Sequence, residues 1–151
     1  MTAQRDCLAA AAAMIADIPG PVLELGLGNG RTYDHLREIL PGREIFVFDR
    51  RVAAHPDCIP DDAHMIIGDI TETLPGAGAA IGAPVALAHC DMGTGVAASN
   101  AELARLIGPA LARLMAPGGV IVSDQEYRVA GWTEVALPDG VASGRYFIRR
   151  A

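Results

Sequence analysis

A loop rich in glycine lies near the start of the chain, between an apolar run at 22–25 and a segment at 32–40 whose apolar side chains recur at helical spacing. The loop consists of Glu24, Leu25, Gly26, Leu27, Gly28, Asn29 and Gly30. Glycine lets a backbone turn tightly and approach a ligand closely. A glycine loop between a strand and a helix is therefore a candidate site for a nucleotide-like cofactor.

The spacing of this loop differs from the dinucleotide-binding pattern. That pattern requires a glycine at position 31, where this chain has Arg31. The missing glycine normally permits close helix–strand packing beside a pyrophosphate. The carboxylate of Glu24 would repel a pyrophosphate and attract a cation. The loop favours a cationic cofactor without phosphate, and a nicotinamide-dinucleotide-binding oxidoreductase is the alternative.

An acidic residue follows each of four predicted strands at 45–48, 65–67, 85–88 and 119–122. These residues are Asp49, Asp69, Asp91 and Asp124. Because the carboxyl ends of parallel strands meet at one edge of a sheet, we expect all four acids to lie there. Asp49 comes 19 residues after Gly30, where a carboxylate can accept hydrogen bonds from both ribose hydroxyls and disfavours a 2′-phosphate.

Strands alternate with helices along most of the chain, which predicts right-handed crossovers. We expect helices at 3–17, at 32–40, and from Ser99 or Asn100 to about 115 with a kink at Gly108-Pro109. Strand-like runs at 132–137 and 145–149, joined by a Pro-Asp-Gly turn, predict an edge hairpin. The predicted fold is α/β, a Rossmann-like, doubly wound, mostly parallel sheet with a C-terminal antiparallel hairpin, in one domain spanning 1–151.

Composition limits the class of protein and of partner. The chain has 151 residues, of which 51% are hydrophobic and 20% charged, as expected of one soluble domain. Its net charge of -6 provides no positive field for a phosphate backbone, so we expect no nucleic-acid partner. Three cysteines without paired spacing favour reduced thiols and a cytoplasmic location. No apolar stretch approaches the roughly 20 residues that span a bilayer, so no membrane association is expected.

From about Pro21 to its end the chain resembles the class I S-adenosylmethionine-dependent methyltransferases. The family's glycine loop is matched by 24–30, its ribose acid by Asp49 and its adenine-contacting acid by Asp69. The Pro-Gly-Gly turn at 117–119 and the terminal hairpin are also typical. The resemblance implies S-adenosyl-L-methionine as cofactor, bound by Glu24, Gly26, Leu27, Gly28, Asn29, Gly30, Asp49, Arg50, Asp69 and Ile70.

Methyl transfer is an in-line displacement at a carbon that the sulfonium already activates, so the protein mainly aligns the reactants and excludes water. A general base is needed where the acceptor must lose a proton. His89 and Asp91 follow the fourth strand, where the family places substrate-facing residues, and they are the candidate catalytic residues. A strand-end histidine can equally be held by structural hydrogen bonds. The Asn-Pro-Pro-Tyr signature of base amino-methylation is absent, and we expect a small-molecule acceptor.

Three questions stay open in the sequence. Metal-dependent O-methyltransferases hold a divalent cation with acids similar to Asp91 and Asp124, but glutamine replaces their asparagine at position 125, and we assign no metal ligand. A non-catalytic S-adenosylmethionine-binding protein is a further alternative. Few residues separate Asp124 from Trp132 and no second domain can close over a substrate. We therefore expect an open pocket that a second subunit completes in a homodimer.

Overall fold

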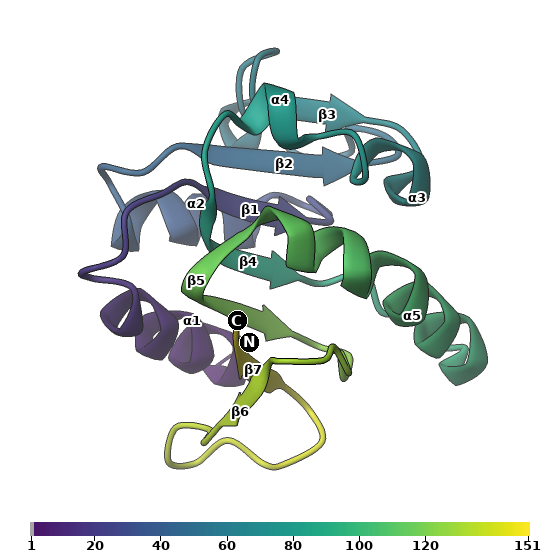
Figure 1. Ribbon diagram of the computed structural model, residues 1–151. Coiled ribbons are helices and arrows are strands. Elements are labelled where there is room, and N and C mark those ends of the chain that lie inside the picture. The colour runs from purple at the N-terminus through teal and green to yellow at the C-terminus, as the bar shows by residue number, and fades with distance from the viewer. Residues whose placement is uncertain (1) are drawn as a thin grey trace.

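A computed structural model describes residues 2–151 and shows seven strands and five α-helices (Figure 1). In chain order the elements are α1 (Thr2–Met14), β1 (Val22–Leu25), α2 (Arg31–Ile39), β2 (Ile45–Asp49), a short 3-10 helix (Pro56–Cys58), β3 (Met65–Ile67), α3 (Ile70–Thr73), α4 (Gly78–Ile81), β4 (Val85–Cys90), α5 (Ala97–Leu114), β5 (Met115–Ser123), β6 (Thr133–Val135) and β7 (Phe147–Arg150).

The strands form a single sheet in the order β3-β2-β1-β4-β5-β7-β6, which runs from top to bottom in Figure 1. The five strands from β3 to β5 are parallel, whereas β7 is antiparallel to both β5 and β6. This order reverses direction between β1 and β4, and ligands bind at such switch points in open α/β sheets. The predicted fold class and terminal hairpin are confirmed.

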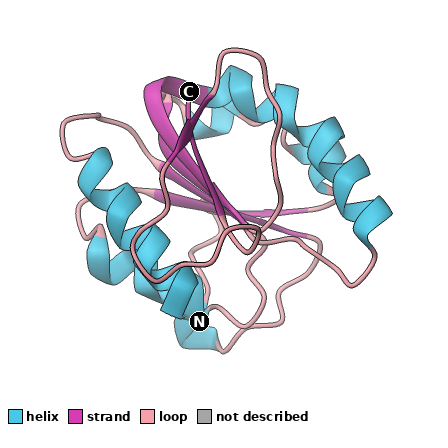
Figure 2. Ribbon diagram, turned by 90° about the horizontal axis from the view of Figure 1, so that it is seen from below, coloured by secondary structure: helices cyan, strands magenta, loops and turns pink. Residues whose placement is uncertain are grey.

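Helices cover both faces of the sheet, as Figure 2 shows. One apolar core lies beneath α1 and α2 and includes Leu8, Ile15 and Leu36, while the other lies beneath α3, α4 and α5 and includes Ile107 and Leu111. All four residues of β1 and all six of β4 are buried, as expected of strands covered on both faces. The central strands are therefore rigidly held at the point where they end.

The long helix α5 differs from its predicted form at its start. It begins at Ala97, without a side-chain cap, and Asn100 lies buried inside it. The Asn100 amide oxygen accepts hydrogen bonds from the backbone N–H and the hydroxyl of Thr94, so this side chain anchors the preceding loop. The prediction that Ser99 or Asn100 caps the helix was wrong. The helix continues through Pro109.

Two further features concern the segment between β5 and β6 and the length and polarity of the helices. No helix lies between β5 and β6 within the described part of the chain, as the short spacing predicts. None of the helices among residues 2–151 is long and apolar enough to cross a membrane.

Candidate functional site

A cleft of about 450 Å³ opens where the parallel strands end, and we call it the edge cleft. It is lined by Gly26, Gly28, Phe48, Asp49, Arg50, Gly68, Ile70, Asp91, Met92, Thr94 and Leu103. A larger groove of about 920 Å³ runs along α5, and none of the predicted site residues lines it. The edge cleft thus coincides with the switch point of the sheet and with the predicted site.

Close backbone packing explains two of the loop glycines. Gly26 has φ 96°, and a side chain there would place its Cβ 2.6 Å from the carbonyl oxygen of Asp91. Gly30 has φ 82°, and its Cβ would lie 2.5 Å from Cβ of Cys58. Other residues rarely adopt these positive φ values. The loop is therefore pressed against the chain that follows β4 and the chain that follows β2.

Asp49 at the end of β2 holds the glycine loop directly. Its Oδ2 accepts hydrogen bonds from the backbone N–H groups of Leu27 at 2.8 Å and Gly28 at 3.3 Å. Its Oδ1 accepts from the N–H of Arg50 at 2.7 Å. Since a carboxylate has about four acceptor positions, part of this capacity is already used. Asp49 fixes the loop and lines the edge cleft at the same time.

Asp69 lies beside the edge cleft and does not line it, although its neighbours Gly68 and Ile70 do. Its Oδ1 accepts from both the N–H and the hydroxyl of Thr71 at the start of α3, and its Oδ2 pairs with Arg50 at 3.3 Å. The hydrogen bonds from Thr71 lower the pKa of Asp69. The predicted contact of Asp69 with adenine stays a prediction.

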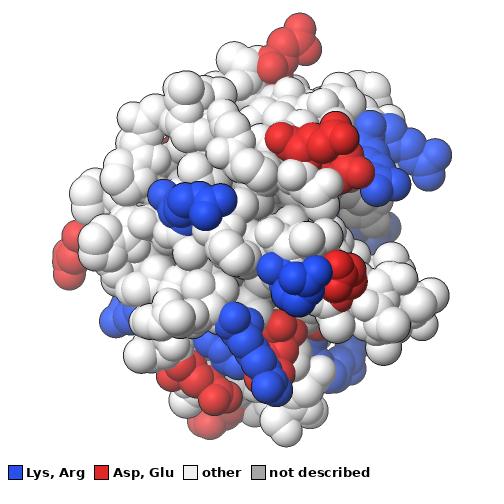
Figure 3. Space-filling view, turned by 45° about the vertical axis from the view of Figure 1, so that its right-hand side comes forward, with Lys and Arg blue, Asp and Glu red and all other residues white. Residues whose placement is uncertain are grey.

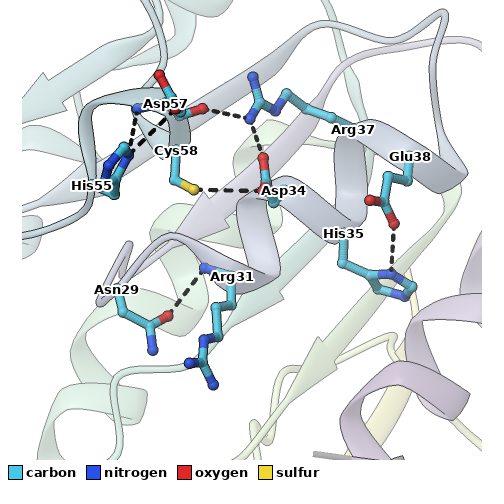
Figure 4. A network of polar contacts seen from close by, with 9 residues as sticks. All are labelled: Asn29, Arg31, Asp34, His35, Arg37, Glu38, His55, Asp57 and Cys58. Carbon is cyan, nitrogen blue, oxygen red and sulfur yellow. Dashed lines mark hydrogen bonds and ion pairs between the residues drawn. The ribbon is translucent and has the colours of Figure 1, made fainter.

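Polar contacts fasten the segment after β2 onto α2, next to the glycine loop (Figure 4). Arg37 binds both the carboxylate of Asp34 and, at 2.8 Å, the carbonyl oxygen of Asp57. The thiol of Cys58 donates to Asp34 at 3.5 Å. Asn29 accepts from the N–H of Arg31 at 3.0 Å. These contacts set the position of the backbone that faces Gly30.

Glu24 and His89 form a pair behind the edge cleft. They occupy paired positions on β1 and β4, and Nδ1 of His89 lies 2.6 Å from Oε1 of Glu24. Their side chains are 1% and 0% exposed, and Oε2 of Glu24 has no hydrogen-bond partner among the described residues. Burial raises the pKa of Glu24 more than His89 lowers it. Burial opposes the charge on His89, but Glu24 and the nearby acids raise its pKa overall.

Gln4 of α1 connects this pair to the surface. Its amide nitrogen lies 3.4 Å from Nε2 of His89 and donates to Oδ2 of Asp91 at 3.1 Å. Its oxygen accepts from the hydroxyl of Thr32 at 3.2 Å. Gln4, Thr32 and Asp91 border a second, smaller space of about 160 Å³, which we call the polar hollow. It is lined by Gln4, Arg5, Asn29, Arg31, Thr32, His35 and Asp91.

Asp91 and Asp124 lie next to each other after β4 and β5. Burial raises the pKa of Asp124, and the charge of Asp91 raises it further. Asp124 accepts the backbone N–H of Gly93 at 3.0 Å. Burial, Asp91 and Asp124 also raise the pKa of Tyr146, which precedes β7. Among residues 2–151 no group of three or more histidine, cysteine or acidic side chains is arranged to hold a metal ion.

The structure thus brings most of the predicted residues to one edge. Gly26, Gly28, Asp49, Arg50, Ile70 and Asp91 line the edge cleft, and Asn29 lines the polar hollow. Leu27 packs in the core, and Gly30 is buried against Cys58. Glu24 and His89 are completely buried and line neither space, so their predicted contacts with cofactor and acceptor stay predictions that this arrangement does not favour.

Sequence reasoning missed several residues at this edge. Phe48 directly precedes Asp49 at the end of β2, so its position at the cleft could have been predicted from the end of that strand. Met92 and Thr94 belong to a loop whose path the sequence does not specify, and Leu103 lies in α5. Gln4 comes from a helix far away in the sequence, and no local signal marks it.

The whole chain is similar to known proteins. Residues 1–151 match a protein-family model described as S-adenosyl-L-methionine methyltransferase. A crystal structure of an S-adenosyl-L-methionine methyl transferase from Silicibacter pomeroyi DSS-3 has 48% sequence identity and a TM-score of 0.92, and the match covers 99% of this chain and 92% of that one. No curated protein matches the sequence.

Two more distant structures share the fold. The MycE methyltransferase from the mycinamycin biosynthetic pathway, in complex with Mg and SAH, has 21% identity and a TM-score of 0.53 over 74% of this chain and 28% of that one. TrmN from Thermus thermophilus has 15% identity and a TM-score of 0.59 over 95% of this chain and 48% of that one. At these identities the likeness concerns the fold alone.

Proposed function

This chain belongs to the S-adenosyl-L-methionine methyltransferase family, and from that premise we propose that it methylates a small molecule that reaches the cofactor beside Asp91. The chain is an S-adenosylmethionine-dependent methyltransferase, and the acceptor is what we infer from the site. One observation carries the proposal: Asp91 is shared by the linings of the edge cleft and the polar hollow. A group near Asp91 can therefore approach a ligand in either space.

The residues of both spaces fit the chemistry of the cofactor. The edge cleft has a volume typical of small-ligand sites and combines apolar walls with the carboxylates of Asp49 and Asp91. We assign the adenosine to the part of the cleft bordered by Asp49, Gly68 and Ile70. Arg5 and Arg31 form no ion pair among the described residues, and both line the polar hollow. Their guanidinium groups suit the carboxylate of the methionine portion.

The protein's contribution to the reaction is alignment and proton acceptance. When bound, S-adenosylmethionine supplies a methyl group that its sulfonium activates for displacement. Gly26 and Gly28 let the backbone approach the ligand, and Asp49 holds the loop through the N–H groups of Leu27 and Gly28. Asp91 is exposed at the wall of the cleft and can accept the proton that an acceptor loses as its lone pair bonds to the methyl carbon. Burial and the charge of Asp91 raise the pKa of the neighbouring Asp124 carboxyl.

The surface supports a small acceptor. The face drawn in Figure 3 carries basic and acidic side chains interspersed among uncharged ones, without a broad basic area. The net charge of -6 likewise disfavours a polyanion.

Methyl transfer into separated cell fractions tests this proposal. The protein is incubated with S-adenosylmethionine carrying a tritiated methyl group and with a small-molecule ultrafiltrate, a protein fraction or a nucleic-acid fraction. We expect label in the small-molecule fraction, reduced about 10²- to 10⁴-fold in Asp91→Asn, as for loss of a general base. Asp62→Asn, a conservative change at an exposed position outside both spaces, is the matched control.

The fraction that becomes labelled decides the outcome. Label confined to the protein or nucleic-acid fraction would overturn the small-molecule acceptor. Cofactor binding without transfer to any fraction would favour the non-catalytic alternative. Equal rates for Asp91→Asn and the wild-type protein would remove Asp91 from the reaction and leave the acceptor class in place.

A further inference from the structure

We propose that the side-chain amide of Gln4 is a two-position switch that couples the protons of the buried Glu24–His89 pair to the charge of Asp91. Gln4 is then a positioning residue for methyl transfer, a role that rests on the function proposed above for Asp91. No proton passes through the amide. The coupling arises from which end of the amide, nitrogen or oxygen, faces its two neighbours.

The geometry fixes one position of the switch. An ionised carboxylate only accepts hydrogen bonds, so the Gln4 nitrogen must face Asp91, as it does at 3.1 Å. The same nitrogen lies 3.4 Å from Nε2 of His89, which must then present a lone pair. The imidazole proton therefore resides on Nδ1 and is donated to Glu24 over 2.6 Å. In this position Asp91 is ionised, His89 is neutral and Glu24 is ionised.

The buried pair favours the other position. An ionised Glu24 beside a neutral His89 is a net buried charge, and Oε2 of Glu24 has no hydrogen-bond partner among the described residues. Adding one proton to the pair makes it neutral overall. The added proton can convert His89 to imidazolium, which carries a proton on both ring nitrogens. It can instead protonate Glu24, which then donates to Nδ1 of a neutral His89. In both cases Nε2 of His89 carries a proton. That N–H needs an acceptor, and the Gln4 amide is the group in contact with Nε2.

The two demands on the amide exclude each other. If its oxygen turns toward Nε2–H of His89, the same oxygen faces Asp91. An ionised Asp91 would be repelled, whereas a protonated Asp91 can donate to that oxygen. The hydroxyl of Thr32, on the other side of the amide, can donate or accept and fits both positions. A proton on the pair therefore favours a proton on Asp91, and loss of one favours loss of the other.

Other titratable and charged groups surround the Glu24–His89 pair, and they do not determine the orientation of the Gln4 amide. Asp124 from β5 adds negative charge near His89, and Tyr146 contacts Gln4 through a phenol. The pKa values of Tyr146, Cys7 and Cys90 are all raised, so these groups stay neutral and their protons can turn to suit either position. On the far side of Gln4 the polar hollow also contains Arg5, Arg31 and His35.

Histidine NMR tests the switch, because direct electrostatics predicts the opposite sign. The ring nitrogens of His89 are observed in protein labelled with ¹⁵N-histidine and free of ligands. By charge alone, Asp91→Asn must lower the pKa of His89, since Asp91 raises it. With the switch, Asp91→Asn frees the Gln4 oxygen to face Nε2, and the pKa of His89 rises by about one pH unit. In a Gln4→Met background the switch is absent, and Asp91→Asn lowers the pKa of His89.

A rise that turns into a fall when Gln4 is replaced supports the proposal, and a fall in both backgrounds overturns it. Gln125→Met is the matched control, because it makes the same chemical change at the same edge without contact with His89, and the rise should persist there. If Gln4→Met does not fold, the wild-type tautomer decides. At a pH above the pKa of His89, the proposal requires that Nε2 carries a lone pair and Nδ1 the proton. A proton on Nε2 at that pH refutes the switch.

These measurements need neither acceptor nor cofactor. A wrong acceptor class leaves them unchanged. Conversely, loss of methyl transfer in Asp91→Asn with a falling His89 pKa would retain the proposed function and reject the switch.

Discussion

The buried Glu24–His89 pair yields a prediction about stability that can be worked through in free energy. In the protonation state in which both groups are charged, their attraction at 2.6 Å and an effective dielectric constant of about 20 is roughly 6 kcal/mol. Removing each ion from water costs several kcal/mol, so the pair itself contributes little net stability. Removing one partner is different. In His89→Leu both oxygens of Glu24 lack a partner, and we expect the free energy of unfolding near pH 8 to fall by about 3–5 kcal/mol.

The loss should depend on pH in a stated direction. The pKa of Glu24 is raised above its ordinary value of 4.5 in the folded protein, so the folded state binds this proton more tightly. The corresponding stability is fully present below pH 4.5 and is lost as pH rises through the raised value. In His89→Leu no imidazole lowers the pKa of Glu24, so the unpaired carboxyl takes up a proton more readily and the variant should lose less near pH 5 than near pH 8. The variant also loses the stabilisation that the raised pKa of His89 provides below pH 6.5, which makes this difference smaller.

Urea unfolding at both pH values measures these changes, with the double variant Glu24→Met/His89→Leu as the companion. Because an apolar pair needs no desolvation, the double variant should recover to within about 1 kcal/mol of the wild-type protein or exceed it. A cost below about 1 kcal/mol for His89→Leu at pH 8 would refute the reasoning. So would a double variant that is as unstable as His89→Leu.

Three further outcomes concern the edge cleft and the opposite end of the sheet. Asp49→Ala removes an acceptor of charge-assisted hydrogen bonds, each worth about 1.5–3 kcal/mol. It should weaken S-adenosylmethionine binding about 10- to 150-fold in calorimetric titration. Unchanged affinity would show that Asp49 does not contact the cofactor. Gly26→Ala places a Cβ 2.6 Å from the carbonyl oxygen of Asp91 and should lower both thermal stability and cofactor affinity more than Gly28→Ala, whose Cβ meets open space. The pKa of His64 is raised by hydrogen bonds to two acids, so its contribution to stability is present below about pH 6.5 and is lost as pH rises. His64→Gln should flatten the pH dependence of unfolding in that range, and parallel curves for the two proteins would contradict this.

The sequence predicted the layout of the fold because its signals are local. Glycines at alternate positions, apolar strands and the acids that end them are each visible within a few residues. The topology of a parallel sheet then brings Asp49 and Asp91 to one edge without further information. The start of α5 escaped prediction because Asn100, a residue type that usually caps helices, is used inside the helix to hold Thr94.

The roles of individual polar residues were harder to predict, since a strand position does not reveal what its side chain meets. Glu24 stands in the family's glycine-loop pattern, and its charge suggested contact with a cationic ligand. In the structure its side chain instead meets His89 of the neighbouring strand beneath α1. That pairing depends on the register of β1 against β4 and on the position of α1, whose Gln4 lies 20 residues before Glu24 in the chain.

The involvement of α1 changes how the site is connected to the rest of the protein. Gln4 contacts both Asp91 and His89, so one helix on the face of the sheet touches the exposed carboxylate and the buried pair at once. A shift of α1 would alter both contacts together, because His89 lies in β4 and Asp91 directly follows that strand. Asp91 at the wall of the edge cleft is therefore linked mechanically to the packing of α1, in addition to the electrostatic effect of its neighbour Asp124. On the proposal above, this link lets Gln4, which lies outside both the glycine loop and the family's acids, affect methyl transfer.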